Sequence, residues 1–414
     1  MTSSSFYAGP ERPLLRIDAW EDLVAAVQAG ALTETQWVEL KAALPAAASK
    51  ANLELARDLA SLSVDGGVLL IGVRDPGGTA QDLVGSDDPL DALKGRVDQV
   101  AGSTRIQPPL HLQLTAVRHP DDATRHVLLV AVPASPEAPH MVDERYWGRS
   151  ATGKRPLTDS EASRLMAGRR GVRADFAQRV GLAPPELGHL WPRERRLGWA
   201  QVLVEPAVTH LGSALADAVG DQSPLQLVSA AMSFSAMWRP NLMDLRYGLA
   251  HPDGLSAASF EVADSLQERY RIHALLSDDG AVRVLGPALS PYGSDGTICI
   301  SVNHHMELVH QVLQLASHLG RTYLAYAGAW NVGVHLEGLA GQVSAQALRD
   351  DFGGWRGTPF QTGSYSRTAT VSNSQLGDNV PAVVEQLLRN LARGLGLQRR
   401  MFPYTDPAEI RQRA

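Results

Sequence analysis

The spacing of apolar residues predicts three short helices in the first third of the chain. Apolar residues recur there every three or four positions, which is the period of one helix face. The stretches with this period are 18–29, 51–63 and 91–101. Asp18 stands where a side-chain N-cap begins a helix. We expect this first helix, within residues 1–30, to cap the domain that follows.

Strand-like stretches lie between and after these helices. Residues 68–73 form an unbroken apolar run after the turn Asp65-Gly66-Gly67, a pattern typical of a buried central strand. The glycine pair is expected to form a tight turn that needs positive φ. Shorter β-patterned stretches cover 36–43, 110–118 and 126–132. Residues 31–170 are therefore predicted to form a mixed α/β domain.

The rest of the chain predicts a second domain. Thr158 and Glu161 have the spacing of a capping box and indicate a helix from 158 to about 168. Residues 171–199 are expected to be a linker with a short helix. Helices over 306–319 and 380–395 alternate with strand-like runs, so that a separate α+β domain is expected over 200–414. These runs cover 201–208, 270–276, 281–285, 297–302 and 322–336. The fold class predicted for the whole chain is α+β.

Composition places this chain among soluble globular proteins. With 414 residues, 44% hydrophobic, it is long enough for two cores. No apolar run reaches the roughly 18 residues of a membrane span, and the first ten residues do not resemble a signal peptide, so we expect no membrane association and a cytoplasmic location. The single cysteine, Cys299, is expected to be buried and inert. A metal would therefore need Asp, Glu or His ligands.

Charge is unevenly distributed. A net charge of −6 argues against a protein that coats nucleic acid by bulk attraction, but a local basic patch can still bind phosphates. Such a patch consists of Arg145, Arg149, Lys154, Arg155, Arg164, Arg169, Arg170 and Arg173, against only Asp159 and Glu161. With Tyr146 and Trp147 it fits a groove that holds phosphates and stacks on bases. A solvated helix face beside core aromatics explains it equally well.

Three carboxylates lie at informative places in the first domain. Glu34 and Glu39 bracket the strand expected at 36–43, and Asp75 follows the central strand. If the two strands are neighbours, the three acids converge, and oxygen ligands suit Mg²⁺ or Mn²⁺. Lys41, two residues after Glu39 and on the same face of a strand, is placed to offset their repulsion or to contact a phosphate. Without further information, ordinary solvated acids are the simpler interpretation.

A longer series of motifs changes this interpretation. The segment Glu34-Thr-Gln-Trp-Val-Glu39-Leu-Lys41, a helix, and then Gly66-Gly-Val-Leu-Leu-Ile-Gly-Val-Arg-Asp75 resembles the Schlafen AlbA-like domain. Further matches follow in the same order at Ile106-Gln-Pro-Pro, Val132-Pro-Ala-Ser, Ala138-Pro-His140 and Tyr146-Trp-Gly-Arg149. The resemblance covers about 140 residues and is confined to the N-terminal domain.

The resemblance implies a function. In Schlafen nucleases of this family, two Glu and one Asp form a metal-dependent RNA-cleaving triad, whose positions match Glu34, Glu39 and Asp75. The expected function is thus a divalent-metal-dependent endoribonuclease, with tRNA-like RNA more expected than DNA, acting as a stress or antiviral effector. Its cofactor would be Mg²⁺ or Mn²⁺, and a homodimer or higher homo-oligomer is expected. The residues expected to hold substrate are Lys41, Arg145, Arg149, Lys154, Arg155 and His140.

Two other function classes stay open. A DNA- or RNA-binding regulator would use the same domain as a platform without catalysis. A nucleotide-binding sensor is the second alternative, since relatives of this family include proteins described as ATP-binding. The sequence contains no Gly-x-x-x-x-Gly-Lys-Ser/Thr motif, so an ordinary P-loop is absent.

Overall fold

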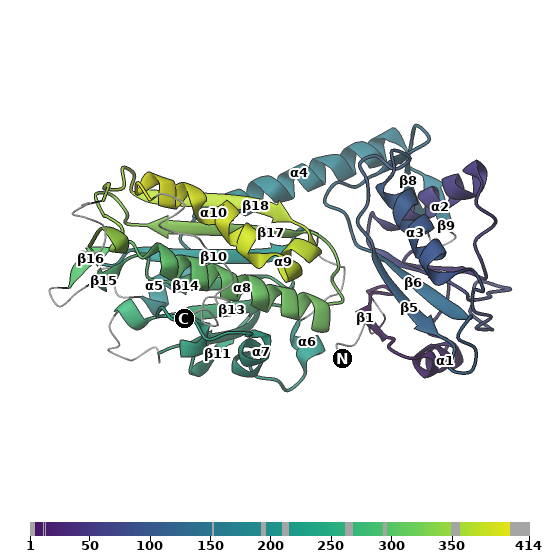
Figure 1. The fold of residues 1–414 in the computed structure, drawn as a ribbon, viewed down its shortest axis with the longest axis horizontal. Helices are drawn as coiled ribbons and strands as arrows, with labels where there is room; N and C mark the ends of the chain where they lie inside the picture. Colours follow the sequence, from purple (N-terminus) through teal and green to yellow (C-terminus); the bar gives the residue numbers. More distant parts are fainter. Residues whose placement is uncertain are drawn as a thin grey trace. The chain divides into compact units, whose positions relative to one another are not determined.

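The chain folds into two compact units. One consists of residues Met1–Val172, Ala207–Ser213 and Gly320–Ala329, and the other of the remainder. The structure, a computed structural model, describes residues 5–10, 12, 14–150, 153–191, 196–208, 215–260, 268–292, 296–348 and 357–397. Figure 1 labels the elements, and each unit is described by itself below.

The N-terminal unit is built on a mixed sheet. Within the described residues its strand order is β3-β4-β6-β5. The strands are β3 (Val38–Lys41), β4 (Gly67–Ile71), β5 (Gln113–Arg118) and β6 (His126–Val132). Strands β3 and β4 are parallel neighbours, as the convergence of the three acids requires, and the other pairs are antiparallel. The central strand predicted at 68–73 is β4, which is buried throughout.

Apolar clusters cover both faces of this sheet. The helices are α1 (Trp20–Gln28), α2 (Ser49–Leu62) and α3 (Leu90–Gly102). Leu69 and Ile71 pack with residues of α2 and α3, whereas Val68 and Leu70 pack with residues of α1. This alternation follows from the period of two in a strand. A three-stranded sheet of β7 (Met141–Val142), β8 (Arg145–Ser150) and β9 (Gly153–Pro156) lies against α2, and β1 (Ser5–Phe6) pairs with β2 (Leu15–Arg16).

Two local predictions need correction. The N-cap of α1 is Ala19, not Asp18, and the carboxylate of Asp22 accepts the backbone N–H groups of Asp18 and Ala19. Of the glycine pair, only Gly66 has positive φ, at +79°. Gly67 is required for a different reason, because a Cβ there would lie 2.3 Å from the carbonyl oxygen of Trp37, the residue before β3.

The C-terminal unit contains a seven-stranded antiparallel sheet within the described residues, in the order β11-β12-β13-β14-β10-β17-β18. Its strands are β10 (Trp199–Pro206), β11 (Tyr247–His251), β12 (Gly254–Ala258), β13 (His273–Ser277), β14 (Val282–Gly286), β17 (Trp330–Glu337) and β18 (Ser364–Val371), and a separate pair is β15 (Ser290–Tyr292) with β16 (Thr297–Cys299). The prediction of an α+β domain in this part of the chain is confirmed.

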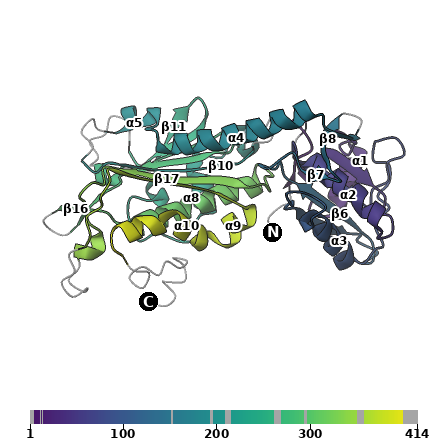
Figure 2. The same ribbon diagram turned by 90° about the horizontal axis from the view of Figure 1, so that it is seen from above.

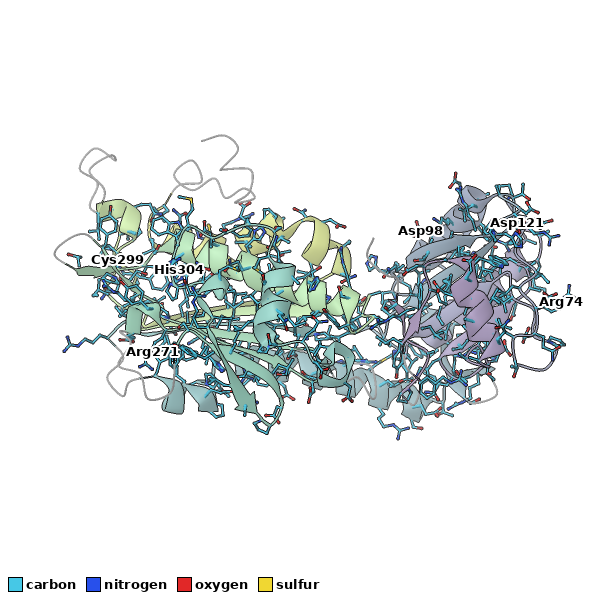
Figure 3. The ribbon with its side chains drawn as sticks, turned by 90° about the horizontal axis from the view of Figure 1, so that it is seen from below. Arg74, Asp98, Asp121, Arg271, Cys299 and His304 are labelled. Atoms are coloured by element: carbon cyan, nitrogen blue, oxygen red, sulfur yellow. The ribbon has the colours of Figure 1, made fainter. Side chains whose placement is uncertain are left out.

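Helices cover both faces of this sheet. In Figure 2, α8 and α10 lie along one face, and α5 and the end of α4 lie on the other. The helices are α4 (Asp159–Gly181), α5 (Pro185–Leu190), α6 (Leu215–Val219), α7 (Pro224–Ala231), α8 (Val302–Thr322), α9 (Asn373–Asp378) and α10 (Val380–Gly394), with short 3-10 turns at Leu242–Asp244, Glu268–Tyr270 and Ala345–Leu348. Cys299 is buried as expected, and Figure 3 labels it in this unit.

Three boundaries differ from the sequence-based ones. The helix predicted to end near residue 168 continues as α4 to Gly181, so that the expected linker over 171–199 contains half of α4 and all of α5. The capping box is as predicted, because Thr158 N–H donates to Glu161 at 2.9 Å. The strand expected over 322–336 begins only at Trp330, since α8 extends to Thr322. No helix in the described part of the chain has the length and apolar character needed to cross a membrane.

Candidate functional site

The turn that carries Asp75 lies beside Glu34. The backbone N–H of Glu34 donates to the carbonyl oxygen of Gly78 at 2.6 Å. Within the turn, the N–H of Gly78 donates to the carbonyl oxygen of Asp75 at 3.4 Å. Glu39 lies on β3, paired in register with Leu69 of β4. The turn after β4 therefore brings Asp75 near Glu34, whereas Glu39 lies within β3.

These acids are close enough to interact electrostatically. Burial raises the pKa of Glu34 above its ordinary value, and the negative charges of Glu39 and Asp75 raise it further. One oxygen of Glu34, Oε1, accepts the backbone N–H of Leu40 at 3.2 Å. The surroundings of Glu34 thus disfavour its charged form.

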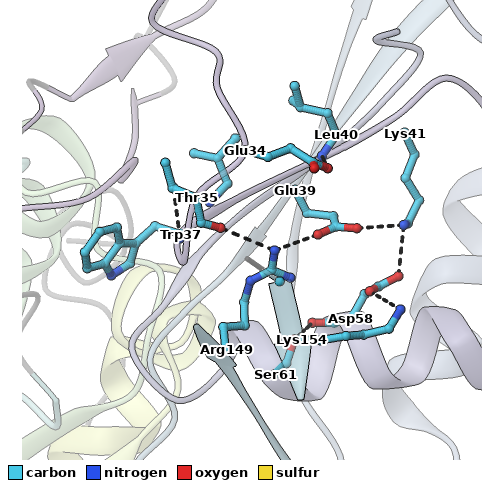
Figure 4. Close-up of polar contacts among 12 residues, drawn as sticks. Glu34, Thr35, Trp37, Glu39, Leu40, Lys41, Asp58, Ser61, Arg149 and Lys154 are labelled. Carbon is cyan, nitrogen blue, oxygen red and sulfur yellow. Dashed lines mark hydrogen bonds and ion pairs between the residues drawn. The ribbon is translucent and has the colours of Figure 1, made fainter. Parts of the chain in front are cut away.

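Glu39 is paired with two cations. Its Oε1 lies 2.8 Å from Nζ of Lys41, and its Oε2 lies 2.6 Å from Nη2 of Arg149. Burial by itself would raise the pKa of Glu39, but the charges and hydrogen bonds of Lys41 and Arg149 outweigh it and lower this pKa. As Figure 4 shows, both oxygens of the carboxylate point at cationic partners.

Asp58 on α2, which the sequence reasoning missed, is the most buried acid of the site. Its side chain is 1% exposed and lies 3.1 Å from Nζ of Lys41 and 2.5 Å from Nζ of Lys154 (Figure 4). A signal for it exists in the sequence, because Asp58 interrupts the apolar face formed by Leu55, Leu59 and Leu62. A charged residue on the buried face of a helix needs a partner.

The ion pairs continue outward from Lys154 in alternating sign. Lys154 lies 3.1 Å from Glu54, Glu54 lies 2.6 Å from Arg57, and Arg57 lies 3.0 Å from Asp143. Together with the inner pairs, four acids and four bases form one chain, which we call the charge network: Arg149, Glu39, Lys41, Asp58, Lys154, Glu54, Arg57 and Asp143. It joins β3, α2 and the β7–β9 sheet without net charge.

Arg149 is a buried member of this network. Its side chain is 2% exposed, and besides Glu39 it donates through Nη2 to the carbonyl oxygen of Thr35 at 3.3 Å. Its Nε and Nη1 atoms are buried without a hydrogen-bond partner. Arg149 was predicted to hold substrate phosphates. In this structure its side chain extends from β8 and is buried against Glu39 and Thr35.

The other predicted basic residues are spread over different environments. Arg145 is exposed, whereas Arg155 donates two hydrogen bonds to Glu161, at 2.6 and 3.0 Å. Arg169 donates to the carbonyl oxygen of Val64 at 2.8 Å. Arg164 and Arg170 are exposed on α4, and the side chain of Arg173 lies outside the described residues. The sequence segment 145–173 is therefore not one continuous basic surface.

His140 does not overhang the site with a free ring. Its side chain is 1% exposed, with Nδ1 2.6 Å from the carbonyl oxygen of Pro108 and Nε2 2.8 Å from Oγ of Ser135. Burial lowers its pKa, so that the ring is held neutral. The carbonyl can only accept a hydrogen bond, which assigns the proton to Nδ1 and makes Nε2 the acceptor for the Ser135 hydroxyl. His140 thus holds the loop 133–140 in place.

The donor set does not fit a preformed Mg²⁺ or Mn²⁺ site. Such ions need several free oxygen ligands within about 2 to 3 Å of one point. Among the residues that the structure describes, no three His, Cys, Asp or Glu side chains gather closely enough to hold a metal. In addition, Lys41 and Arg149 contact both oxygens of Glu39, so this carboxylate offers a metal no free oxygen.

Comparisons with known proteins place the N-terminal unit. Residues 34–158 match the family model described as Schlafen, AlbA_2. Among solved structures, the DIP2311 protein of Corynebacterium diphtheriae is 20% identical over 42% of this chain and 32% of its own length, with a TM-score of 0.25. The N-terminal domain of an ATP-dependent DNA helicase RecG-related protein from Nitrosomonas europaea is 19% identical over 34% of this chain and 92% of its own, also with a TM-score of 0.25.

These structural likenesses are too low to support an argument about function. This chain spans about a third of the length of the Corynebacterium protein. A comparison with curated proteins gave no match. The family match, by contrast, covers the segment from Glu34 past Arg155 in which the motifs were found. The prediction from those motifs is confirmed: residues 34–158 of this chain form a Schlafen AlbA_2 domain.

Proposed function

We propose that the Schlafen AlbA_2 domain binds the phosphate backbone of a nucleic acid, RNA in preference to DNA. The observation that carries the proposal is that one buried carboxylate, Asp58, holds the ammonium groups of both Lys41 and Lys154. These lysine side chains are 24% and 23% exposed, so their charges are fixed in place and still reach solvent. Fixed, solvent-accessible cations are the groups that contact phosphates in nucleic-acid complexes.

The preference for RNA comes from the family resemblance. Arg145, exposed on the first position of β8, supplies a further positive charge in the same domain. The binding requires no metal, because the interacting groups are ammonium and guanidinium ions. The chain would then act as a regulator that recognises nucleic acid.

Fluorescence anisotropy with a labelled single-stranded RNA, in the presence of EDTA, tests this function. The Lys41→Met/Lys154→Met variant should bind at least about tenfold more weakly, and its salt dependence should fall by about 1.4 in log K against log salt, about 0.7 for each lost phosphate contact. A Lys50→Met/Lys94→Met variant changes the charge equally at two lysines outside the charge network. If both double variants bind alike, or if the unmodified protein does not bind RNA, the proposal is wrong.

A second candidate, a metal-dependent endoribonuclease, is favoured by one observation. The negative charges of Glu39 and Asp75 raise the pKa of Glu34, and a bound cation would relieve this repulsion. Such an enzyme would suit a stress or antiviral effector that cleaves tRNA-like RNA. Incubation of the protein with total RNA and Mn²⁺, beside a Glu39→Gln/Asp75→Asn variant, separates the two functions. Cleavage by the unmodified protein alone supports the nuclease, whereas equal cleavage or none by both contradicts it.

A further inference from the structure

We propose that Lys41 and Arg149 occupy the cation position beside Glu39, so that a divalent metal binds Glu39 only after these side chains release its carboxylate. The proposal starts from the mismatch between the three family acids and a preformed metal site. In this chain, the middle acid of the three already has an ammonium at 2.8 Å and a guanidinium at 2.6 Å.

Burial makes this arrangement persistent. Glu39 is 14% exposed and Arg149 only 2%, so water does not readily replace the guanidinium. A carboxylate whose two oxygens each face a cation presents a positive surface to an approaching metal ion. A metal ion would have to compete with Lys41 and Arg149 for Glu39. Both side chains are already held beside Glu39 by the fold, which favours them in this competition.

Lys41 is anchored from its far side as well. Asp58, 1% exposed, lies 3.1 Å from the same Nζ atom, so that Lys41 bridges two acids instead of swinging freely. Release of Glu39 therefore requires another anion to take its place at Lys41.

A nucleic-acid phosphate is such an anion, and in this respect the inference rests on the proposed function. Phosphate bound to Lys41 would take the place of one oxygen of Glu39.

Titration of the full-length protein with Mn²⁺ alone, followed by electron paramagnetic resonance, tests the cation position without any nucleic acid. The unmodified protein should show no saturable site below about 1 mM. The Lys41→Met variant should gain a site at least about tenfold tighter, and the additional change Glu39→Gln should remove it. Lys154→Met is the matched control, because it takes an ammonium from Asp58 but leaves Glu39 paired.

Two results would overturn the proposal. One is tight Mn²⁺ binding by the unmodified protein that is lost in Glu39→Gln. The other is an unchanged metal affinity in Lys41→Met when its thermal unfolding shows a folded N-terminal unit. If Lys41→Met does not fold, Lys41→Gln is titrated in its place. The first result needs only the unmodified protein and Glu39→Gln, so it can overturn the proposal whether or not a Lys41 variant folds. Because no RNA is present, failure here leaves the RNA-binding proposal untouched.

A second, independent observation concerns the edge of the C-terminal sheet. Within the residues that the structure describes, β18 pairs with β17 on one side and ends the sheet on the other. It is eight residues long, and Ser364, Ser366, Thr368 and Thr370 on it are exposed. Exposed edge strands usually carry several charges, a proline or a bulge that prevents pairing with another chain, whereas β18 has a single charge, Arg367.

We infer that a second copy of this chain pairs antiparallel along β18. A two-fold axis at Thr368 places Arg367 of each copy opposite Ala369 of the other, so that no like charges meet. The same register pairs Ser366 with Thr370 and Thr368 with its own copy, since directly opposite residues must lie on the same face of the sheet. The strand can therefore pair with itself without repulsion between charges.

Analytical ultracentrifugation over a range of protein concentrations tests this pairing. Thr368→Arg places two arginines opposite each other and should weaken the dimer by about fivefold or more, whereas Ala369→Glu places an acid opposite Arg367 and should strengthen it. Thr362→Arg makes the same change outside the strand, at an exposed position, and should have no effect. A monomeric unmodified protein, or a dimer insensitive to both Thr368→Arg and Ala369→Glu, contradicts the inference.

Discussion

Asp58 and Lys154 lie 96 positions apart in the sequence, and in the folded chain Nζ of Lys154 lies 2.5 Å from Oδ1 of Asp58. The carboxylate is 1% exposed, so this contact fixes α2 to β9 across the interior of the domain. Lys41 of β3 holds the other oxygen of the same carboxylate at 3.1 Å. One buried acid therefore determines the position of two cations from different strands.

The first prediction follows from this burial. Asp58→Asn removes the negative charge and leaves Lys41 and Lys154 near one another without their common partner. Because the lysines are partly exposed, we expect a cost at the low end for broken buried pairs, about 2 to 3 kcal/mol in the free energy of unfolding. Urea unfolding measures it. Asp98→Asn, an exposed acid of the same unit (Figure 3), is the control and should change stability by less than about 0.5 kcal/mol. Equal effects of the two changes would show that Asp58 is not the anchor.

The second prediction concerns acid pH. Glu39 has a pKa below its ordinary value of 4.5 in the folded chain. Its ion pairs therefore stabilise the fold fully above that value, and this contribution is lost as the pH falls through the lower folded-state pKa. Glu39→Gln should thus lose less stability than the unmodified protein when the pH is lowered from about 7 to about 3. Unfolding free energies measured at both pH values check this, and parallel losses in the two proteins would argue against it.

The third prediction separates two neighbouring glycines. Gly67→Ala places a Cβ 2.3 Å from the carbonyl oxygen of Trp37 and should cost about 3 kcal/mol, because backbone must move. Gly66→Ala should cost only about 1 kcal/mol, because it places a side chain on a residue with a left-handed conformation, φ +79°. Thermal unfolding of both variants distinguishes them. If Gly66→Ala proves more destabilising than Gly67→Ala, the turn conformation would matter more for the glycine pair than the close approach of the chain at Trp37 to β4.

The fourth prediction concerns His140, which was expected to contact substrate. Since both ring nitrogens are bonded inside the fold, His140→Ala should lower the free energy of unfolding by about 2 kcal/mol. The pKa of His140 is lowered by burial, so its stabilising effect is present above 6.5 and declines as the pH falls through the lower folded-state value. His111→Ala, at an exposed position, is the control. RNA affinity measured below the unfolding transition should stay unchanged, and a specific loss of affinity would restore the substrate role.

Features that depend on neighbouring residues could be predicted from the amino-acid sequence. Helix periodicity located α1, α2 and α3, and the apolar run located β4, because burial of one face repeats with the period of the element. The capping box of Thr158 and Glu161 was equally readable, since both partners lie in one turn of helix. The order of motifs from Glu34 to Arg149 was enough to predict the family of the N-terminal domain, which the comparison confirmed.

Only the tertiary structure decided which charges meet. The partners of Glu39 include Arg149, which is 110 positions away, and no local pattern encodes a contact over that distance. The sequence singled out Glu34, Glu39 and Asp75 as candidate metal ligands, but the packing of α2 and β8 against β3 paired Glu39 with cations. Buried polar groups take whichever partner the packing supplies, because an unpaired charge in the interior is too costly. The chemistry of these acids therefore depends on how the elements pack, which the order of residues alone does not reveal.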